Sequence, residues 1–167
     1  MSVFTGLEGP LRPTGQCFDD ALEFFEIFDT AQLQVRHYLA NAMRIAHGIC
    51  AVASGETFVH AWVEESLLGD DIDRRHWPRE VVWQATLCEA GRTFYAVERS
   101  WFYEAYHVRE RQLYTLLDAA KLNVLSGHYG PWLTKYQLQM KPGPQRILGQ
   151  LRNVTVLGTV PPPEPLH

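Results

Sequence analysis

The chain has 167 residues, of which 46% are hydrophobic and 20% charged, and these values suit one globular domain with a buried core. No apolar run reaches about 18 residues and residues 1–13 lack the features of a signal peptide, so neither a membrane-spanning helix nor a secretory leader is expected. The three cysteines are widely spaced and form no CxxC pair, which argues against disulfides and structural zinc and favours a soluble protein of the reducing cytoplasm.

Charge is unevenly distributed along the chain. Residues 119–163 contain five lysines and arginines and no acidic residue, although the whole chain carries a net charge of −4. Such a segment could bind a polyanion or an acidic partner, or it could pack against the acidic remainder of its own domain. Because the five charges are spread out rather than clustered, we favour packing within the domain and do not expect nucleic acid as a partner.

The predicted elements begin after residues 1–15, a stretch rich in glycine and proline that predicts an irregular arm. A helix is expected to start near Cys17, because an apolar stripe runs through Phe18 and Leu22 and two aspartates occupy the favourable first turn. A second helix, capped by its first residue, is expected over residues 30–45.

The next part of the chain changes to short apolar runs typical of strands. Residues 47–53 and 57–65 are partly β-branched and flank a Ser-Gly-Glu turn, so they predict a β-hairpin. A polar loop over residues 68–79 then leads to two further strands, residues 80–88 and 92–98. Together these runs predict an antiparallel meander.

Helical periodicity returns in the last part of the chain. Residues 101–108 and 110–125 predict two helices, and Gly127 is expected to end the second in a left-handed conformation. Residues 132–140 could form a short helix or an extended arm, and residues 154–160 could form a terminal strand.

Helices thus precede and follow an antiparallel sheet of about four strands. This segregation predicts an α+β fold rather than alternating helices and strands. We expect one domain over residues 1–167, made of the arm, a core over residues 16–125 and a basic, Pro/Gly-rich extension over residues 126–167.

Cys17 is the candidate nucleophile. A thiol at a helix N-terminus lies near the positive end of the helix dipole, which lowers its pKa, and near free backbone N–H groups that could hold an oxyanion. Most cysteines are instead small buried hydrophobic residues, and Cys50 and Cys88, which lie inside apolar strands, fit that alternative.

His60 is the candidate base, although a strand histidine taken alone is more often structural. Alternation along the strand puts His60, Trp62 and Glu64 on one face and an apolar set on the other. The imidazole should therefore point away from the apolar core face, and the Cys17 helix is the natural cover for its side. Glu64 is too far along the same strand to orient the ring, so we expect the next strand to supply that group, through Gln84.

Three sequence blocks resemble those of transglutaminase-like proteins, which belong to the papain-like cysteine hydrolase superfamily. The blocks are GQCFDDA at residues 15–21, HAWVE at residues 60–64 and VWQAT at residues 82–86, in the family's order of Cys, His and Asp blocks. In detail they are similar to a group of small bacterial and phage proteins, and FYAV at residues 94–97 loosely matches the strand that follows. The resemblance covers roughly residues 15–106.

The resemblance implies a papain-like or transglutaminase-like core that needs no cofactor or metal. It implies Cys17 as nucleophile and His60 as base in the hydrolysis or transfer of acyl groups of a peptide, protein or small molecule. Gln84 stands where the family has an acidic residue; an amide can orient a histidine but stabilises an imidazolium less than a carboxylate does. Substrate contacts are expected from the neighbouring residues Gln16, Trp62 and Trp83.

A second hypothesis is a catalytically weakened protein that binds or inhibits a partner through the basic segment or through an aromatic surface. The aromatic turn at residues 127–132 could form a cleft wall, but packing over the fold is favoured. A metal site is not expected, because residues 70–73 lack the remaining ligands of a calcium loop and His47 and Cys50 have no second ligand pair. No P-loop or GxGxxG motif supports nucleotide binding.

Overall fold

The computed structural model describes residues 14–31, 43–67, 75–89, 91–141 and 159–160. The helices and strands within these ranges confirm the predicted α+β class. In chain order they are α1 (Cys17–Ala31), β1 (Met43–Ala51), β2 (Thr57–Ser66), β3 (Glu80–Cys88), β4 (Gly91–Glu98), α3 (Arg99–Ala105), β5 (Glu110–Tyr114), α4 (Leu116–Ser126), α5 (Thr134–Gln137) and β6 (Thr159–Val160).

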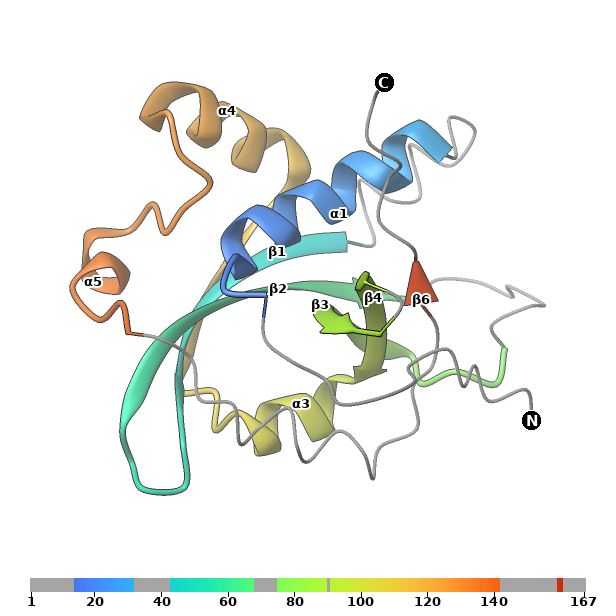
Figure 1. Ribbon diagram of the computed structural model, residues 1–167, viewed down its shortest axis with the longest axis horizontal. Coiled ribbons are helices and arrows are strands. Elements are labelled where there is room, and N and C mark those ends of the chain that lie inside the picture. Colours follow the sequence, from blue (N-terminus) through green and yellow to red (C-terminus); the bar gives the residue numbers. More distant parts are fainter. Residues whose placement is uncertain (1–13, 32–42, 68–74, 90, 142–158, 161–167) are drawn as a thin grey trace.

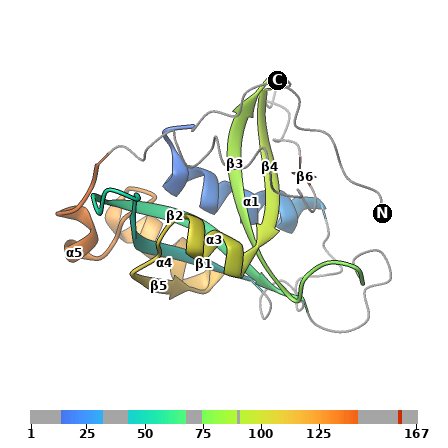
Figure 2. The same ribbon diagram turned by 90° about the horizontal axis from the view of Figure 1, so that it is seen from below.

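The strands form one antiparallel sheet in the order β5-β1-β2-β3-β4-β6. α1 lies over β1 and β2 (Figure 1). The β3–β4 hairpin runs steeply across the direction of β1, β2 and β5 (Figure 2). The sheet is therefore strongly bent between β2 and β3.

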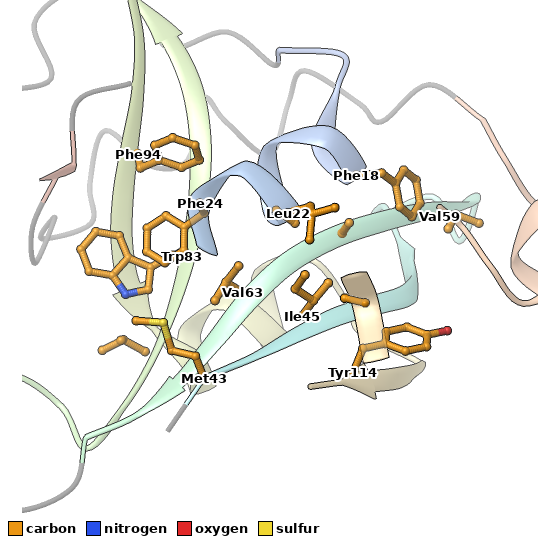
Figure 3. Close-up of a cluster of buried hydrophobic side chains, with 14 of the residues drawn as sticks. Phe18, Leu22, Phe24, Met43, Ile45, Val59, Val63, Trp83, Phe94 and Tyr114 are labelled. Carbon is orange, nitrogen blue, oxygen red and sulfur yellow. The ribbon is translucent and has the colours of Figure 1, made fainter. Parts of the chain in front are cut away.

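Each face of the sheet carries its own apolar core. On one face, Val59, Ala61 and Val63 of β2 cluster with residues of α1 such as Phe24, as the close-up in Figure 3 shows for the larger side chains. On the other face, Trp62 clusters with aromatic residues of α3. Both faces of β2 are thus buried, which explains why its sequence is apolar on the predicted core face and aromatic on the opposite one.

β2 and β3 pair over only part of their length. Their register runs from Ser66–Glu80 to Val63–Trp83, whereas β2 pairs with β1, and β3 with β4, along nearly their whole lengths. The two ladders therefore separate beyond Val63 and Trp83. Beyond these pairs the backbones of β2 and β3 are no longer in register with each other, and the candidate site lies there.

The predicted hairpin and the two strands after it are confirmed, as β1–β2, β3 and β4. Gly127 ends α4 with a φ of 74°, the predicted left-handed conformation. Residues 132–140, for which a short helix or an arm remained open, contain the single turn α5.

Residues 110–114 form a strand, although periodicity predicted a helix over residues 110–125. β5 pairs with the outer edge of β1 and buries only Tyr114. The stretch consists largely of good helix formers, but ladder hydrogen bonds to that edge outweigh this preference, because tertiary context overrides helix propensity. The helix begins after Thr115, whose hydroxyl accepts from the Asp118 backbone N–H as an N-cap.

The prediction of a second helix over residues 30–45 is wrong for the residues that the structure describes. Residues 43–45 belong to β1, and Thr30 lies inside α1 rather than capping another helix. α1 instead continues to Ala31. The rest of that predicted helix, the N-terminal arm at residues 1–13 and the loop at residues 68–74 lie outside the described residues.

Two lysines of the basic segment pair with acidic residues outside it. Lys135 Nζ lies 2.7 Å from a carboxylate oxygen of Glu110, and Lys141 Nζ lies 3.7 Å from one of Glu56. These pairs fit packing within the domain; Arg146 and Arg152 lie outside the described residues. Among the helices that the structure describes, none has the length and apolarity to cross a membrane.

Gly48 lies at a point of β1 where no side chain fits. An added Cβ would lie 2.5 Å from Cη2 of Trp62 and 2.7 Å from the backbone oxygen of Glu110. The second clash is with backbone and is relieved only if β5 shifts. We therefore expect Gly48→Ala to lower the free energy of unfolding by about 2–3 kcal/mol in urea denaturation. Ser54→Ala, in the exposed β1–β2 turn, is the control, and equal midpoints for both variants would contradict this expectation.

Candidate active site

A pocket of about 550 Å³ lies where β2 and β3 diverge, next to the start of α1. It brings together three predicted site residues that are far apart in the sequence: Cys17 from α1, His60 from β2 and Gln84 from β3. Most of the remaining lining is apolar. The end of strand pairing thus creates the space that these three polar residues line.

Cys17 is the first residue of α1 and is half-buried in the pocket. Burial raises the pKa of its thiol from 9.0 to about 12; the backbone N–H groups of Ala61 and Phe18 lower it, and the charge of Asp20 raises it further. The predicted lowering of this pKa is therefore wrong. The helix N-terminus does favour the thiolate, but the loss of water around the sulfur outweighs it, so the thiol is protonated at neutral pH.

His60 is held by Gln84, as the sequence predicted. Its Nε2 lies 2.5 Å from the side-chain oxygen of Gln84. An amide oxygen can only accept, so Nε2 carries the proton and the lone pair of the neutral ring is on Nδ1. Burial lowers the pKa of His60 to about 4, although the bond to Gln84 raises it. The ring is therefore a neutral base at pH 7, with one defined basic nitrogen.

Gln84 is itself fixed by two tyrosines. Its Nε2 donates to the hydroxyl of Tyr95 at 2.9 Å and to that of Tyr106 at 3.3 Å. The Tyr106 ring also stacks on the His60 ring, with centroids 5.3 Å apart and an interplanar angle of 14°. Burial raises the pKa of both phenols, so they stay neutral. In this network the amide nitrogen faces the two hydroxyls and the amide oxygen faces His60 Nε2.

The two tyrosines were not predicted as site residues. Tyr95 could have been found, because counting the hairpin register back from the Cys88–Gly91 pair places it opposite Gln84. Tyr106 follows α3, and its approach to Gln84 depends on how that helix packs on the sheet. No pattern in the sequence indicates that contact.

The Cys17 helix covers the opposite face of β2 from the one that was expected. Ala61 and its apolar neighbours face α1, whereas His60 faces α3. The pocket nevertheless reaches both Cys17 and His60, because β3 does not close the sheet beside this part of β2. In the described part of the chain, no hydrogen bond joins the thiol to the imidazole. Cys17 and His60 thus lie on opposite faces of β2, and both line the pocket beside the strand edge that β3 leaves unpaired.

A buried carboxylate lies one helical turn after Cys17. Arg92 Nη1 donates to Oδ1 of Asp20 at 2.8 Å, and the Thr14 hydroxyl donates to Oδ2. Arg92 also pairs with Glu23. Burial raises the pKa of Asp20, while Thr14 and Arg92 lower it. Asp20 lines the pocket, but both of its oxygens are already engaged.

Two of the three expected substrate contacts line the pocket. Trp62 and Trp83 do so, and both are almost fully buried. Their indole N–H groups donate to Glu64 at 3.0 Å and to Glu65 at 2.9 Å, respectively. Gln16 is exposed and is not among the residues that line the pocket, so the structure does not support its expected role.

His47 lies in an aromatic enclosure next to the site. Its ring is fully buried, with centroids 4.7 Å from Phe18, 5.0 Å from Tyr114 and 4.7 Å from Trp132. Neither ring nitrogen, nor the Tyr114 hydroxyl, has a hydrogen-bond partner among the described residues. Burial lowers the pKa of His47 to about 3. Trp132 shows that the turn at residues 127–132 packs over the fold, the favoured alternative.

His47 and Cys50 do not form a metal site. They are three residues apart on β1, so they point to opposite faces, and Cys50 belongs to the α3-side core. Within the described ranges, no group of three or more His, Cys, Asp or Glu side chains is arranged to hold a metal ion. Residues 70–73 lie outside the described residues.

Comparison with known proteins adds no relative. No protein family, no curated protein and no solved structure matches the chain.

Proposed function

We propose that the chain is a thiol-dependent enzyme acting on acyl groups, of the papain-like, transglutaminase-like kind that its sequence blocks resemble. Cys17 is the nucleophile, His60 the general base, and Gln84 a positioning residue. The observation that carries this proposal is the His60–Gln84 hydrogen bond inside the pocket that also contains Cys17. It leaves a neutral imidazole with its basic nitrogen fixed as Nδ1, which is what proton transfer from a thiol requires.

The reaction is an acyl transfer through a thioester. His60 Nδ1 takes the proton from Cys17 as the sulfur attacks the acyl carbonyl carbon, and the carbonyl electron pair moves to oxygen. The backbone N–H groups of Ala61 and Phe18 lie close enough to the sulfur to affect its pKa, and can donate to that oxygen. Collapse breaks the bond to the leaving group, which takes the proton from His60. Water or an amine then attacks the thioester and restores the thiol.

The resting charges determine when the proton moves. Because the Cys17 thiol is protonated and the His60 ring neutral at pH 7, proton transfer accompanies attack and does not precede it. Alkylating agents that need a preformed thiolate should therefore react slowly. Activated acyl donors bound in the pocket should react faster, because the base acts within the bound complex.

Acylation of Cys17 tests the proposal. We expect p-nitrophenyl hexanoate to add one hexanoyl group per chain, detected by intact mass spectrometry and located on Cys17 by peptide mapping. Cys17→Ala should abolish the adduct, and His60→Gln should slow its formation by about 100-fold or more. Cys88→Ala removes a buried strand cysteine and is the matched control. The enzyme would be rejected by a folded wild type that forms the adduct on Cys88, or by one that forms no adduct and releases p-nitrophenol no faster than Cys17→Ala.

A binding protein without catalysis is the second candidate. The raised pKa of Cys17 and the amide at position 84 favour it, because the first weakens the nucleophile and the second stabilises the imidazolium less than a carboxylate would. In that case Cys17→Ala should retain all of the protein's binding activity. The same mass experiment separates the two candidates, because a binder forms no acyl adduct.

A further inference from the structure

We infer that the site takes acyl groups with an apolar chain, which lies between the diverging parts of β2 and β3 while its carbonyl carbon is at Cys17. The inference rests on the proposed function for the reaction at Cys17, but the binding of the apolar acyl chain depends on the pocket alone. Pocket walls, charges and volume each support it.

The walls beyond Cys17 are aromatic and aliphatic. Phe24 of α1 packs on Trp83, with centroids 5.1 Å apart, and on Phe94, at 5.3 Å, and all three line the pocket. Val63 and Ala85 complete this part of the lining. These rings are already anchored in the core, so a ligand chain adds to an existing apolar cluster without ordering new side chains.

Apart from Cys17 Sγ and His60 Nδ1, the polar side-chain atoms of the described lining already have partners. The indole N–H groups of Trp62 and Trp83 donate to buried glutamates, so the rings offer only carbon to the pocket. Gln84 is engaged by His60 on one side and by two tyrosines on the other. A polar substrate group would have to break one of these bonds, which disfavours sugars and polar side chains such as a peptide glutamine.

The lining charges are also engaged. Among the described lining residues the charged ones are Asp20 and Lys141. Asp20 pairs with Arg92 and Thr14, and Lys141 with Glu56. Asp20 is therefore not left to bind a charged substrate group, and the side chain of Lys141 is 57% exposed. Binding in the buried part of the pocket must then come from burial of apolar surface. The volume of about 550 Å³ lies within the range of small-molecule sites and exceeds what a short acyl group fills.

Binding of neutral methyl ketones to the Cys17→Ala protein tests the inference. Straight-chain ketones, from acetone to 2-dodecanone, carry the acyl carbonyl without a leaving group, and the variant prevents their addition to sulfur. Calorimetric affinity should rise about fourfold per methylene, the factor for complete burial, until the chain reaches the end of the pocket. An affinity that does not depend on chain length would overturn the inference.

A pocket-filling variant shows where the chain binds. Ala85→Phe, added to Cys17→Ala, should lower the affinity for 2-decanone by tenfold or more and leave shorter ketones less affected. Leu125→Phe on α4 is the control, because Leu125 is 83% exposed and does not line the pocket. If Leu125→Phe lowered 2-decanone binding and Ala85→Phe did not, the ketone would bind on the exposed α4 surface, and the inference would be overturned. If Ala85→Phe fails to fold, the length series on Cys17→Ala alone decides.

The two proposals fail in different ways. If ketone affinity rises with chain length but no acyl adduct forms on Cys17, the proposed function fails and the inference of a pocket for an apolar chain stands. If adducts form equally fast from acetyl and decanoyl p-nitrophenyl esters and ketone affinity is independent of length, the inference fails and the proposed function stands.

Discussion

Acidification from neutral pH to about pH 3 is expected to remove several kcal/mol of folding free energy, most of it through His47. The pKa of this buried ring is about 3 in the folded protein and 6.5 when it is exposed. As the pH falls below 6.5, the unfolded chain therefore binds the proton first, and stability is lost until the pH reaches about 3. The difference corresponds to about 5 kcal/mol for His47, and the pKa of about 4 for His60 adds about 3 kcal/mol.

Urea denaturation of a His47→Leu variant as a function of pH checks this expectation. Leucine has a similar volume, cannot ionise and removes two unpaired polar atoms. The variant should therefore be at least as stable as the wild type at pH 7, and its advantage should grow by several kcal/mol as the pH falls to about 4. His76→Leu removes an exposed histidine and should follow the wild-type curve. The raised pKa of Asp20 acts in the opposite direction but is common to all three proteins. Parallel pH curves for wild type and His47→Leu would contradict the assignment.

Replacing Gln84 by glutamate is expected to make the site a stronger base. A carboxylate would accept the His60 Nε2–H in place of the amide oxygen and stabilise the imidazolium that forms during attack. An anion at this distance raises a histidine pKa by about 1–3 units. The low-pH limb of the Cys17 acylation rate should therefore move up from about pH 4 by that amount, and the rate on its plateau should rise by tenfold or more. Stopped-flow release of p-nitrophenol across pH 3–9 measures both.

The matched variant is Gln84→Leu, which keeps the size of the side chain but neither accepts nor donates. It leaves the N–H of His60 Nε2 unpaired and removes one hydrogen bond from each tyrosine, although the two hydroxyls still bond to each other. It should therefore lower the free energy of unfolding by about 1–3 kcal/mol and slow acylation. If Gln84 only filled space, Gln84→Glu would leave the pH profile unchanged. That result would remove Gln84 from the proposed mechanism.

Local patterns in the sequence predicted the elements that hold the site. The start of α1 at Cys17, the β1–β2 hairpin and β3 follow from periodicity, turns and caps, which act over a few residues. The His60–Gln84 contact was also predicted, because side chains on neighbouring antiparallel strands lie close together. Each of these inferences needs only short-range geometry.

The features that were mispredicted depend on the whole fold. β5 forms because β1 has an edge available for pairing, and the sequence of residues 110–114 does not indicate that edge. α1 covers the face opposite to His60, and the two share a pocket only because β2 and β3 stop pairing. The thiol pKa rises because tertiary burial around Cys17 exceeds the effect of its helix terminus. Desolvation and strand divergence cannot be derived from sequence spacing.

The placement of β5 at one end of the sheet also bears on self-association. An outer strand offers backbone groups to which another molecule can add a strand, and charged side chains there discourage such pairing. Glu110 and Arg111 of β5 are exposed and are held by Lys135 and Glu64 of the same chain. These ion pairs hold charged side chains along the outer strand, so a second copy that paired with this edge would have to bury those charges. The pairs that attach β5 to its own domain thereby also oppose aggregation through that edge.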